Sequence, residues 1–401
     1  MNTILDIYKI GRGPSSSHTM AVKSIVLDFI KKHPNADRFV ARAGGSLALT
    51  GLGHKTDFIM QQVFEESFKF TEQSGKVILD KTYQDIENPC PLEMTALYEG
   101  SQDVKVVYFS IGGGDFAKKG QEVPAVQFEY DSFAKLQSNL NKHIKDPSKL
   151  VSKEEFEHIK KAWQTMQFCI KQGLTKTGVL DGGLNYMRQA KDRYSKKDYL
   201  SAFAYAVAEE NASAETDIVT CPTCGACGIL PAILYYQKLY NQLDDSQIYR
   251  ALIVAGLIAE IVKMVMPTSG AAYGCQAEVG VACAMSAGAL AWISGGNIAQ
   301  IEAAASIALE DCLGMTCDPV LGLVQVPCID RNALKANSIM NYVNYAMFNM
   351  TNRVRHFDKT LLAMKETGRD MNERYRETST GGLAEQYLKD EKEFFIENPY
   401  S

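Results

Sequence analysis

The sequence lacks an excess of positive charge. Its 401 residues include 42 lysines and arginines against 47 aspartates and glutamates, which gives a formal net charge of −5 at pH 7. The pI is about 5.8. Proteins that bind nucleic acid or an anionic membrane usually carry basic patches that raise the pI. We therefore expect neither nucleic acid nor a membrane among the partners of this chain.

A signal peptide and a membrane span are also missing from the sequence pattern. Residues 1–9 mix charged side chains with apolar ones and lack the basic-then-apolar layout of a signal peptide. The apolar runs at residues 251–266 and 279–294 are shorter than the roughly 20 residues that a span needs. The first run also contains Glu260 and Lys263. Both runs predict buried helices of a soluble protein.

Cysteine is plentiful, but its context argues against a disulfide scaffold. The chain has ten cysteines and no recognisable export signal. In a reducing compartment thiols stay free or bind metal rather than form disulfides. We therefore expect a cytoplasmic protein, in which the cysteines stay free or bind metal.

Two common cofactor motifs are absent. The glycine-rich stretch at residues 44–57, G-G-S-L-A-L-T-G-L-G-H-K-T-D, lacks the G-x-G-x-x-G order of a dinucleotide-binding loop. No lysine stands in a convincing pyridoxal-phosphate motif. A nucleotide-dependent oxidoreductase and a pyridoxal-phosphate enzyme are therefore not favoured.

The distribution of strand-forming and helix-forming segments along the chain predicts two domains. Residues 77–79, 104–111 and 126–130 are rich in β-formers and bounded by turns, so residues 1–135 predict an α+β domain with helices and a mostly antiparallel sheet. Residues 136–152 are polar and predict a linker. Helical periodicity then dominates, which predicts a large, mainly α-helical domain at residues 153–401.

Serine and histidine gather at the predicted start of a helix. The segment G-P-S-S-S-H-T contains Ser15, Ser16, Ser17 and His18 and precedes an apolar helical face. The N-terminus of a helix presents free N–H groups to an anion, although the residues alone favour simple N-capping by the serines. His54 lies in the glycine-rich stretch at residues 44–57, and the chain has only six histidines. Both histidines are candidates for catalysis.

Two groups of cysteines are candidates for metal binding. Cys275, Cys317 and Cys328 lie among glycine, proline and small residues, but their wide spacing is a weak signal, and buried structural cysteines are the alternative. A C-x-x-C-x-x-C run at residues 221–227 resembles the opening of a ferredoxin motif. Pro231 occupies the place of the fourth ferredoxin cysteine, so an electron carrier is the less favoured reading.

Longer motifs around these cysteines carry a specific resemblance. The chain contains G-C-Q-A-E-V-G, C-D-P-V and V-Q-V-P-C-I-D-R-N in this order. These segments resemble the iron–sulfur L-serine dehydratases, in a single-chain form with a β-type and an α-type domain. The resemblance implies that Cys275, Cys317 and Cys328 hold a 4Fe–4S cluster with one iron free of protein thiolate. It also implies that the C-x-x-C-x-x-C turn is a wall of the active site and supplies no ligands.

The same resemblance implies a substrate site for a small amino acid. It assigns His18 and His54 as base or substrate anchor, without deciding which has which role. The implied substrate-binding residues come from three segments; they are Ser15, Ser16, Ser17, Thr19, Ser46, Asn211, Thr223 and Gly225. The resemblance further implies a homodimer and the elimination of water from L-serine to give pyruvate and ammonia.

Several positions depart from the pattern of that family. They include Glu215, Tyr273, Asp311, Cys312 and Met315, which we expect beside the implied cluster site. These departures leave open a related β-elimination from threonine or cysteine. A ligand-binding homologue without a cluster is the non-enzymatic alternative.

Overall fold

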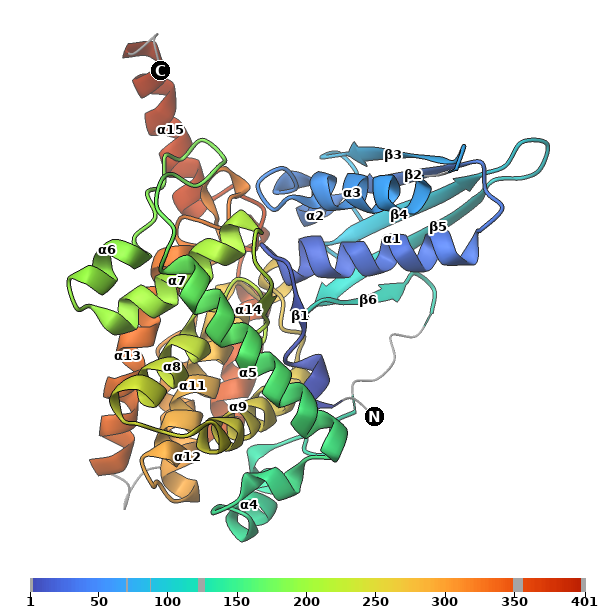
Figure 1. Ribbon diagram of the computed structural model, residues 1–401. Coiled ribbons are helices and arrows are strands. Elements are labelled where there is room, and N and C mark those ends of the chain that lie inside the picture. The colour runs from blue at the N-terminus through green and yellow to red at the C-terminus, as the bar shows by residue number, and fades with distance from the viewer. Residues whose placement is uncertain (1–2, 70, 87, 122–126, 349–355, 398–401) are drawn as a thin grey trace.

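The computed structural model describes residues 3–69, 71–86, 88–121, 127–348 and 356–397, with side chains up to residue 389. Its N-terminal part contains a five-stranded sheet (Figure 1). The strands are β2 (Arg38–Ala43), β3 (Ser74–Leu79), β4 (Pro91–Leu97), β5 (Val104–Gly112) and β6 (Asp115–Lys118). They lie in the order β3-β2-β4-β5-β6; β2 and β3 pair in parallel, and the other neighbours are antiparallel. The predicted, mostly antiparallel sheet is confirmed.

Three helices accompany this sheet. They are α1 (Ala21–Lys32), α2 (Gly45–Leu49) and α3 (Thr56–Phe68). Helices α1 and α3 pack against each other and against the strands. The buried residues of α1 include Val22, Ile25, Val26 and Phe29, which recur on one face of a helix. The apolar face predicted for this helix is therefore confirmed.

One predicted strand is wrong. Residues 127–130 do not form a strand, and Val126 lies outside the described residues. Phe128 and Tyr130 are instead buried in the core of the helical part. Their aromatic side chains give the segment strand-like texture, but burial against helices satisfies the same side chains, so propensity alone misassigned the element.

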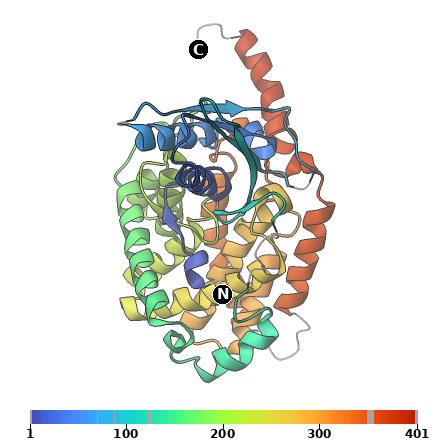
Figure 2. The ribbon, with the colours of Figure 1, turned by 90° about the vertical axis from the view of Figure 1, so that its right-hand side faces the viewer.

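The remainder of the chain is mainly helical, as predicted. The longer helices are α4 (Phe133–Lys142), α5 (Lys153–Gly173), α7 (Tyr199–Ser213), α8 (Ile229–Tyr240), α9 (Asp245–Val265), α11 (Val279–Ile293), α12 (Ile298–Glu310), α13 (Cys328–Phe348), α14 (Phe357–Asp370) and α15 (Gly382–Glu397). The shorter elements are α6 (Ala190–Ser195), α10 (Gly270–Tyr273), η3 (Pro147–Leu150), η4 (Cys275–Ala277), η5 (Val320–Gly322) and η7 (Glu373–Tyr375). Helix α15 projects from this body in both ribbon views (Figures 1 and 2).

Helix α11 is the centre of the helical part. It packs against α8, α9, α12 and α13, and its first 13 residues are all buried. Small side chains allow the close approach, since a Cβ at Gly288 would lie 2.2 Å from Cδ1 of Ile258 on α9. Among the described residues, the stretch Cys275–Ile293 is long and apolar enough to cross a membrane, but 83% of it is buried within the fold. Such burial is typical of a core helix.

The N-terminal segment belongs to the helical core. Ile4 begins the short helix η1 (Ile4–Asp6) and Ile7 follows it, and both are buried there with Tyr8. The Tyr8 hydroxyl donates a hydrogen bond of 2.7 Å to the Leu252 carbonyl of α9. Strand β1 (Ile10–Gly11) then pairs with β7 (Ile218–Val219). The chain therefore starts in the helical part, enters the sheet part and returns, while the domain limits at residues 135 and 153 stay predictions.

We expect Tyr8→Ala to destabilise the helical part strongly. Removing a fully buried aromatic ring costs about 3–5 kcal/mol, whereas Tyr8→Phe loses one hydrogen bond, worth about 1 kcal/mol. The free energy of unfolding from denaturant titration measures both changes. Phe58→Ala is the control, because that ring is 60% exposed. A Tyr8→Ala variant as stable as the Phe58→Ala variant would contradict the packing described above.

Candidate active site

The G-P-S-S-S-H-T segment forms a buried turn at the entrance to α1. The turn η2 (Ser16–Met20) is π-helical, and Ser15 is its N-cap, with its hydroxyl accepting a bond from the His18 N–H. The side chains of Ser15, Ser16, Ser17, His18 and Thr19 are all buried. N-capping therefore accounts for Ser15 alone among the three serines. The Ser16 hydroxyl instead accepts a 3.1 Å hydrogen bond from the Cys224 N–H.

His18 is enclosed by hydroxyl groups. Its Nδ1 lies 3.2 Å from the Ser15 Oγ, and its Nε2 lies 3.0 Å from the Thr50 Oγ1 and 3.1 Å from the Ser46 carbonyl oxygen. Burial and the charge of His54 lower the pKa of His18 to about 4, although Glu377 acts in the opposite direction. His18 is therefore neutral at pH 7.

His54 lies beside His18 and is held by a carboxylate. The two ring centroids are 4.4 Å apart, and His54 Nε2 lies 3.2 Å from Glu377 Oε1. The same oxygen lies 3.8 Å from His18 Nδ1. Burial alone would raise the pKa of Glu377, but His18 and His54 together hold it below its ordinary value. The glycine-rich turn and the C-terminal loop thus meet in one buried cluster.

The loop that carries Glu377 also joins this cluster to the cysteines. The Glu377 N–H donates a 2.6 Å bond to the Cys317 carbonyl oxygen, and the Cys317 N–H donates a 2.8 Å bond to the Tyr375 carbonyl oxygen. The Ser46 hydroxyl donates a 2.6 Å bond to the Glu377 carbonyl oxygen. Backbone and side-chain bonds therefore fix the histidines, Glu377 and Cys317 relative to one another.

The three predicted ligand cysteines share one site. Cys275 begins η4, Cys328 begins α13, and Cys317 lies in the loop before η5. The Cys317 thiol donates to the Cys275 sulfur, and this bond, opposed by burial and aided by the Arg331 guanidinium, lowers the pKa of Cys275 to about 6. The same bond and burial raise the pKa of Cys317, and burial raises the pKa of Cys328.

Glu278 borders the cysteines on the side of the 221–228 turn. Its Oε1 lies 4.0 Å from the Cys317 sulfur, and a Cβ at Gly225 would lie 3.2 Å from its Oε2. Burial, with the charges of Glu377 and Cys275, raises the pKa of Glu278 well above its ordinary value. Thr223, which is also buried, belongs to the same turn. The 221–228 turn therefore lies against Glu278, while its role as a wall of the active site stays a prediction.

Asn211 and Thr19 are bonded to the backbone of the serine turn. Asn211 Nδ2 donates a 2.9 Å bond to the Pro14 carbonyl oxygen, and Thr19 Oγ1 donates to the Arg12 and Ser15 carbonyl oxygens. These hydrogen bonds hold the backbone of the serine turn in place.

The C-x-x-C-x-x-C cysteines are buried among apolar side chains. Cys221, Cys224 and Cys227 are each fully buried, and burial raises the pKa of all three thiols. The Cys221 sulfur contacts the Val219 carbonyl oxygen at 3.7 Å, and the Cys224 sulfur contacts Met20 Sδ at 3.8 Å. Neutral thiols in such surroundings behave as small hydrophobic groups.

The positions that depart from the expected pattern have local partners. Glu215 pairs with Lys176 at 2.5 Å, and Asp311 pairs with Lys335 at 2.5 Å. Tyr273 packs against Gly368, where a Cβ would lie 2.6 Å from the Tyr273 ring. Glu215, Asp311 and Tyr273 therefore each have a structural partner of their own.

Comparisons with known proteins bear directly on this arrangement. Residues 3–63 match the family described as serine dehydratase beta chain, and residues 58–384 match serine dehydratase alpha chain. L-serine dehydratase 2 of Escherichia coli K12 is 38% identical, with 96% of this chain and 98% of that protein covered. The L-serine dehydratase of Haemophilus influenzae is 37% identical, with 96% and 99% covered. That of Streptomyces coelicolor is 32% identical, with 95% and 98% covered.

The chain belongs to the serine dehydratase family. It carries both the beta-chain and the alpha-chain parts of that family in one polypeptide, and the predicted family membership is confirmed. The roles assigned to individual residues stay predictions. Glu278, Arg331 and Glu377 were not among the predicted site residues, although the first two lie inside the motifs that carry the resemblance.

We expect acid to destabilise this serine dehydratase family member through His18. Its folded pKa of about 4 is below its ordinary value of 6.5, so between these values the unfolded chain binds a proton that the folded chain does not. Stability is therefore lost as pH falls from 6.5 towards 4, by at most about 1.4 kcal/mol per pH unit. Urea titrations at several pH values measure this slope.

The comparison uses His18→Gln, which should flatten the slope in that window, and His356→Gln at an exposed histidine, which should not. Equal slopes in wild type and His18→Gln would show that His18 is not buried in its neutral form.

Proposed function

We propose that this protein eliminates water from L-serine to give pyruvate and ammonia. The proposal rests on family membership and on the names of the relatives, which are L-serine dehydratases. The observation that carries it is the junction of the His18–His54–Glu377 cluster with Cys317 through the Glu377 and Ser46 hydrogen bonds. This junction supports the proposal, because it links a candidate proton acceptor to one of the candidate metal ligands.

The donor set fits an iron–sulfur cluster. Cys275, Cys317 and Cys328 are near enough to interact, and one thiol is already biased towards thiolate by a neighbouring S–H and by Arg331. Thiolates are the ligands that such clusters take, and the Arg331 guanidinium would offset part of their charge. We propose that these three cysteines hold a 4Fe–4S cluster. When bound, its iron without a protein thiolate would supply a Lewis acid for the β-hydroxyl group.

His54 is the better candidate for the base. The Glu377 carboxylate can only accept a hydrogen bond from His54. Neutral His54 therefore carries its proton on Nε2, the nitrogen next to Glu377. The Nδ1 of His54 is then a lone-pair acceptor, and it is buried without a hydrogen-bond partner among the described residues. We propose that Nδ1 takes the proton from the α-carbon of the substrate.

His18 is the better candidate for a substrate anchor. Ser15, Ser46 and Thr50 surround its ring, and its lowered pKa keeps it neutral. We propose that the turn at residues 15–17 binds the carboxylate of serine, because it lies at the N-terminal end of α1, where backbone N–H groups can bind an anion. Ser46, Thr19 and Asn211 would hold this turn and the Glu377 loop in place, while Thr223 and Gly225 form the opposite wall beside Glu278.

The remaining expectations are also proposals. A cytoplasmic location is consistent with the free cysteines of the described residues, and a homodimer follows from the family resemblance. Elimination from threonine or cysteine is the alternative reaction.

We expect Cys275→Ser, Cys317→Ser and Cys328→Ser each to lose bound iron and to form pyruvate from L-serine at least about 100-fold more slowly. Iron and acid-labile sulfide are measured on protein purified without oxygen, and pyruvate by a coupled assay. Cys221→Ala is the matched control, because it removes a fully buried thiol outside the proposed ligand set. Loss of iron in Cys221→Ala with retention in Cys317→Ser would reverse the ligand assignment.

A further inference from the structure

A buried amide lies between the segments that carry two of the proposed ligand cysteines. Gln276 follows Cys275 directly and is completely buried. Its side chain has two N–H donors and an oxygen that accepts two hydrogen bonds. Burying these groups without partners would be costly, so the partners of Gln276 show which segments it holds together.

The amide oxygen is bonded to the segment that leads to Cys317. Gln276 Oε1 accepts a 2.9 Å bond from the Gly314 N–H. The backbone N–H of Gln276 donates a 3.2 Å bond to the Met315 carbonyl oxygen. One side-chain bond and one main-chain bond therefore join the residue after Cys275 to two residues just before Cys317.

The remaining positions of the amide are bonded to α10 and α14. Gln276 Nε2 donates to the Tyr273 carbonyl oxygen at 3.0 Å and to the Met364 carbonyl oxygen at 3.1 Å. Its Oε1 also accepts from the Thr367 hydroxyl at 3.0 Å. Two donors and two acceptor positions are thus all used, and the Tyr273 and Met364 carbonyls determine which end of the amide is nitrogen.

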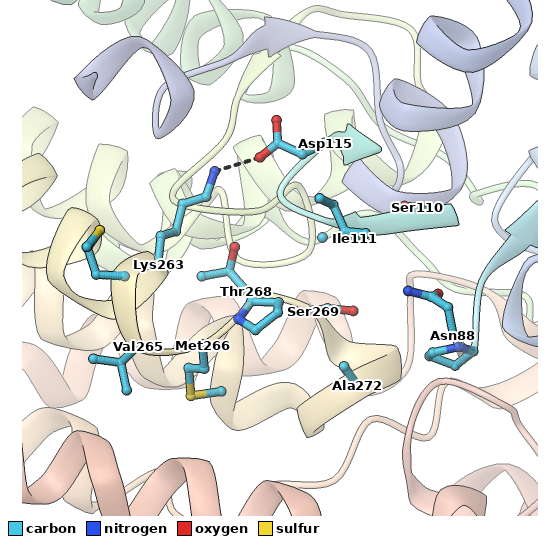
Figure 3. A pocket seen from close by; sticks show the side chains of 14 residues that line it. Asn88, Ser110, Ile111, Asp115, Lys263, Val265, Met266, Thr268, Ser269 and Ala272 are labelled. Atoms are coloured by element: carbon cyan, nitrogen blue, oxygen red, sulfur yellow. Dashed lines mark hydrogen bonds and ion pairs between the residues drawn. The ribbon is translucent and has the colours of Figure 1, made fainter. Parts of the chain in front are cut away.

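Helix α10 depends on such support because it is short. It has four residues, Gly270–Tyr273, and a single helical turn has little stability of its own. Ser269 and Ala272 line the cavity shown in Figure 3, so this side of α10 is not closely packed. The bond from Gln276 to the Tyr273 carbonyl fixes the end of α10 from which the chain continues to Cys275.

Helix α14 can approach the amide because Gly368 has no side chain. A Cβ at Gly368 would lie 2.8 Å from Gln276 Nε2 and 2.6 Å from Cδ1 of the Tyr273 ring. Both distances are shorter than ordinary van der Waals contact. A methyl group at this position would therefore displace the amide from its partners.

We propose that Gln276 is a positioning residue whose amide fixes Cys275 and Cys317 relative to each other. This inference rests on the ligand role proposed above for these cysteines and deepens it. Groups that orient metal ligands commonly contribute about 10–100-fold to metal affinity. Cys328 is fixed in a different way, since it begins the 21-residue helix α13.

The test compares Gln276→Met with Gln237→Met, which removes a buried amide of the same size from α8. Gln237 is 3% exposed, and its Oε1 accepts a 2.5 Å bond from Asn241 Nδ2. Two rates are measured on the full chain, purified and kept without oxygen. They are the removal of iron by a chelator and the hydrogen exchange of the peptide that contains Gly314. We expect Gln276→Met to increase both rates about tenfold or more, and Gln237→Met to leave both within about twofold of wild type.

Gly368→Ala is a second variant, because it displaces the amide without removing it, and it should increase both rates as well. Thermal melts show how far each variant is destabilised, and Gly368→Ala decides the matter if Gln276→Met fails to fold. Rates for both variants equal to those of Gln237→Met would overturn the proposal, as would faster exchange with unchanged iron loss. Wild-type protein without iron after attempted reconstitution would instead contradict the proposed function, and with it the ligand role on which this inference rests.

Discussion

The hydrogen bonds of the Glu377 loop are the constraint on which the rest of the site depends. Through its backbone the loop is bonded to Cys317, and through its carboxylate it holds His54. The Ser46 hydroxyl closes the connection from the sheet part. Three segments that are remote in sequence therefore meet at one residue. Glu377 itself has a φ of +57°, an uncommon conformation for a non-glycine residue that the surrounding contacts must maintain.

The helical part supplies the rigidity that such a junction needs. Helix α11 begins directly after Glu278 and is buried among four other helices. Its alanines and glycines allow α9 to approach closely, so the loops at its N-terminal end have little freedom. Cys275 and Glu278 precede this helix, and Cys328 begins α13, which packs against it. The candidate site is therefore built on helix ends, where unpaired backbone groups and sharp turns occur together.

Features that depend on residues close together in the sequence could be predicted from the sequence. The apolar face of α1 followed from the spacing of Val22, Ile25, Val26 and Phe29, and the three cysteines and two histidines followed from long motifs. Glu377 could not be found in this way, because its importance arises from contacts with His54 and Cys317, which lie far away in the sequence. The strand predicted at residues 126–130 failed because Phe128 and Tyr130 are buried by helices. Tertiary packing overrides strand propensity in such cases.

The central claim is that a cysteine-held cluster and the His54–Glu377 pair act on the same serine molecule. The visible absorption spectrum of protein purified without oxygen, recorded before and after addition of L-serine, tests it most directly. The account predicts a broad iron–sulfur band that shifts when serine is added, because the substrate reaches the iron that has no protein thiolate. A band that does not respond to serine, or a colourless protein after attempted cluster reconstitution, would contradict it.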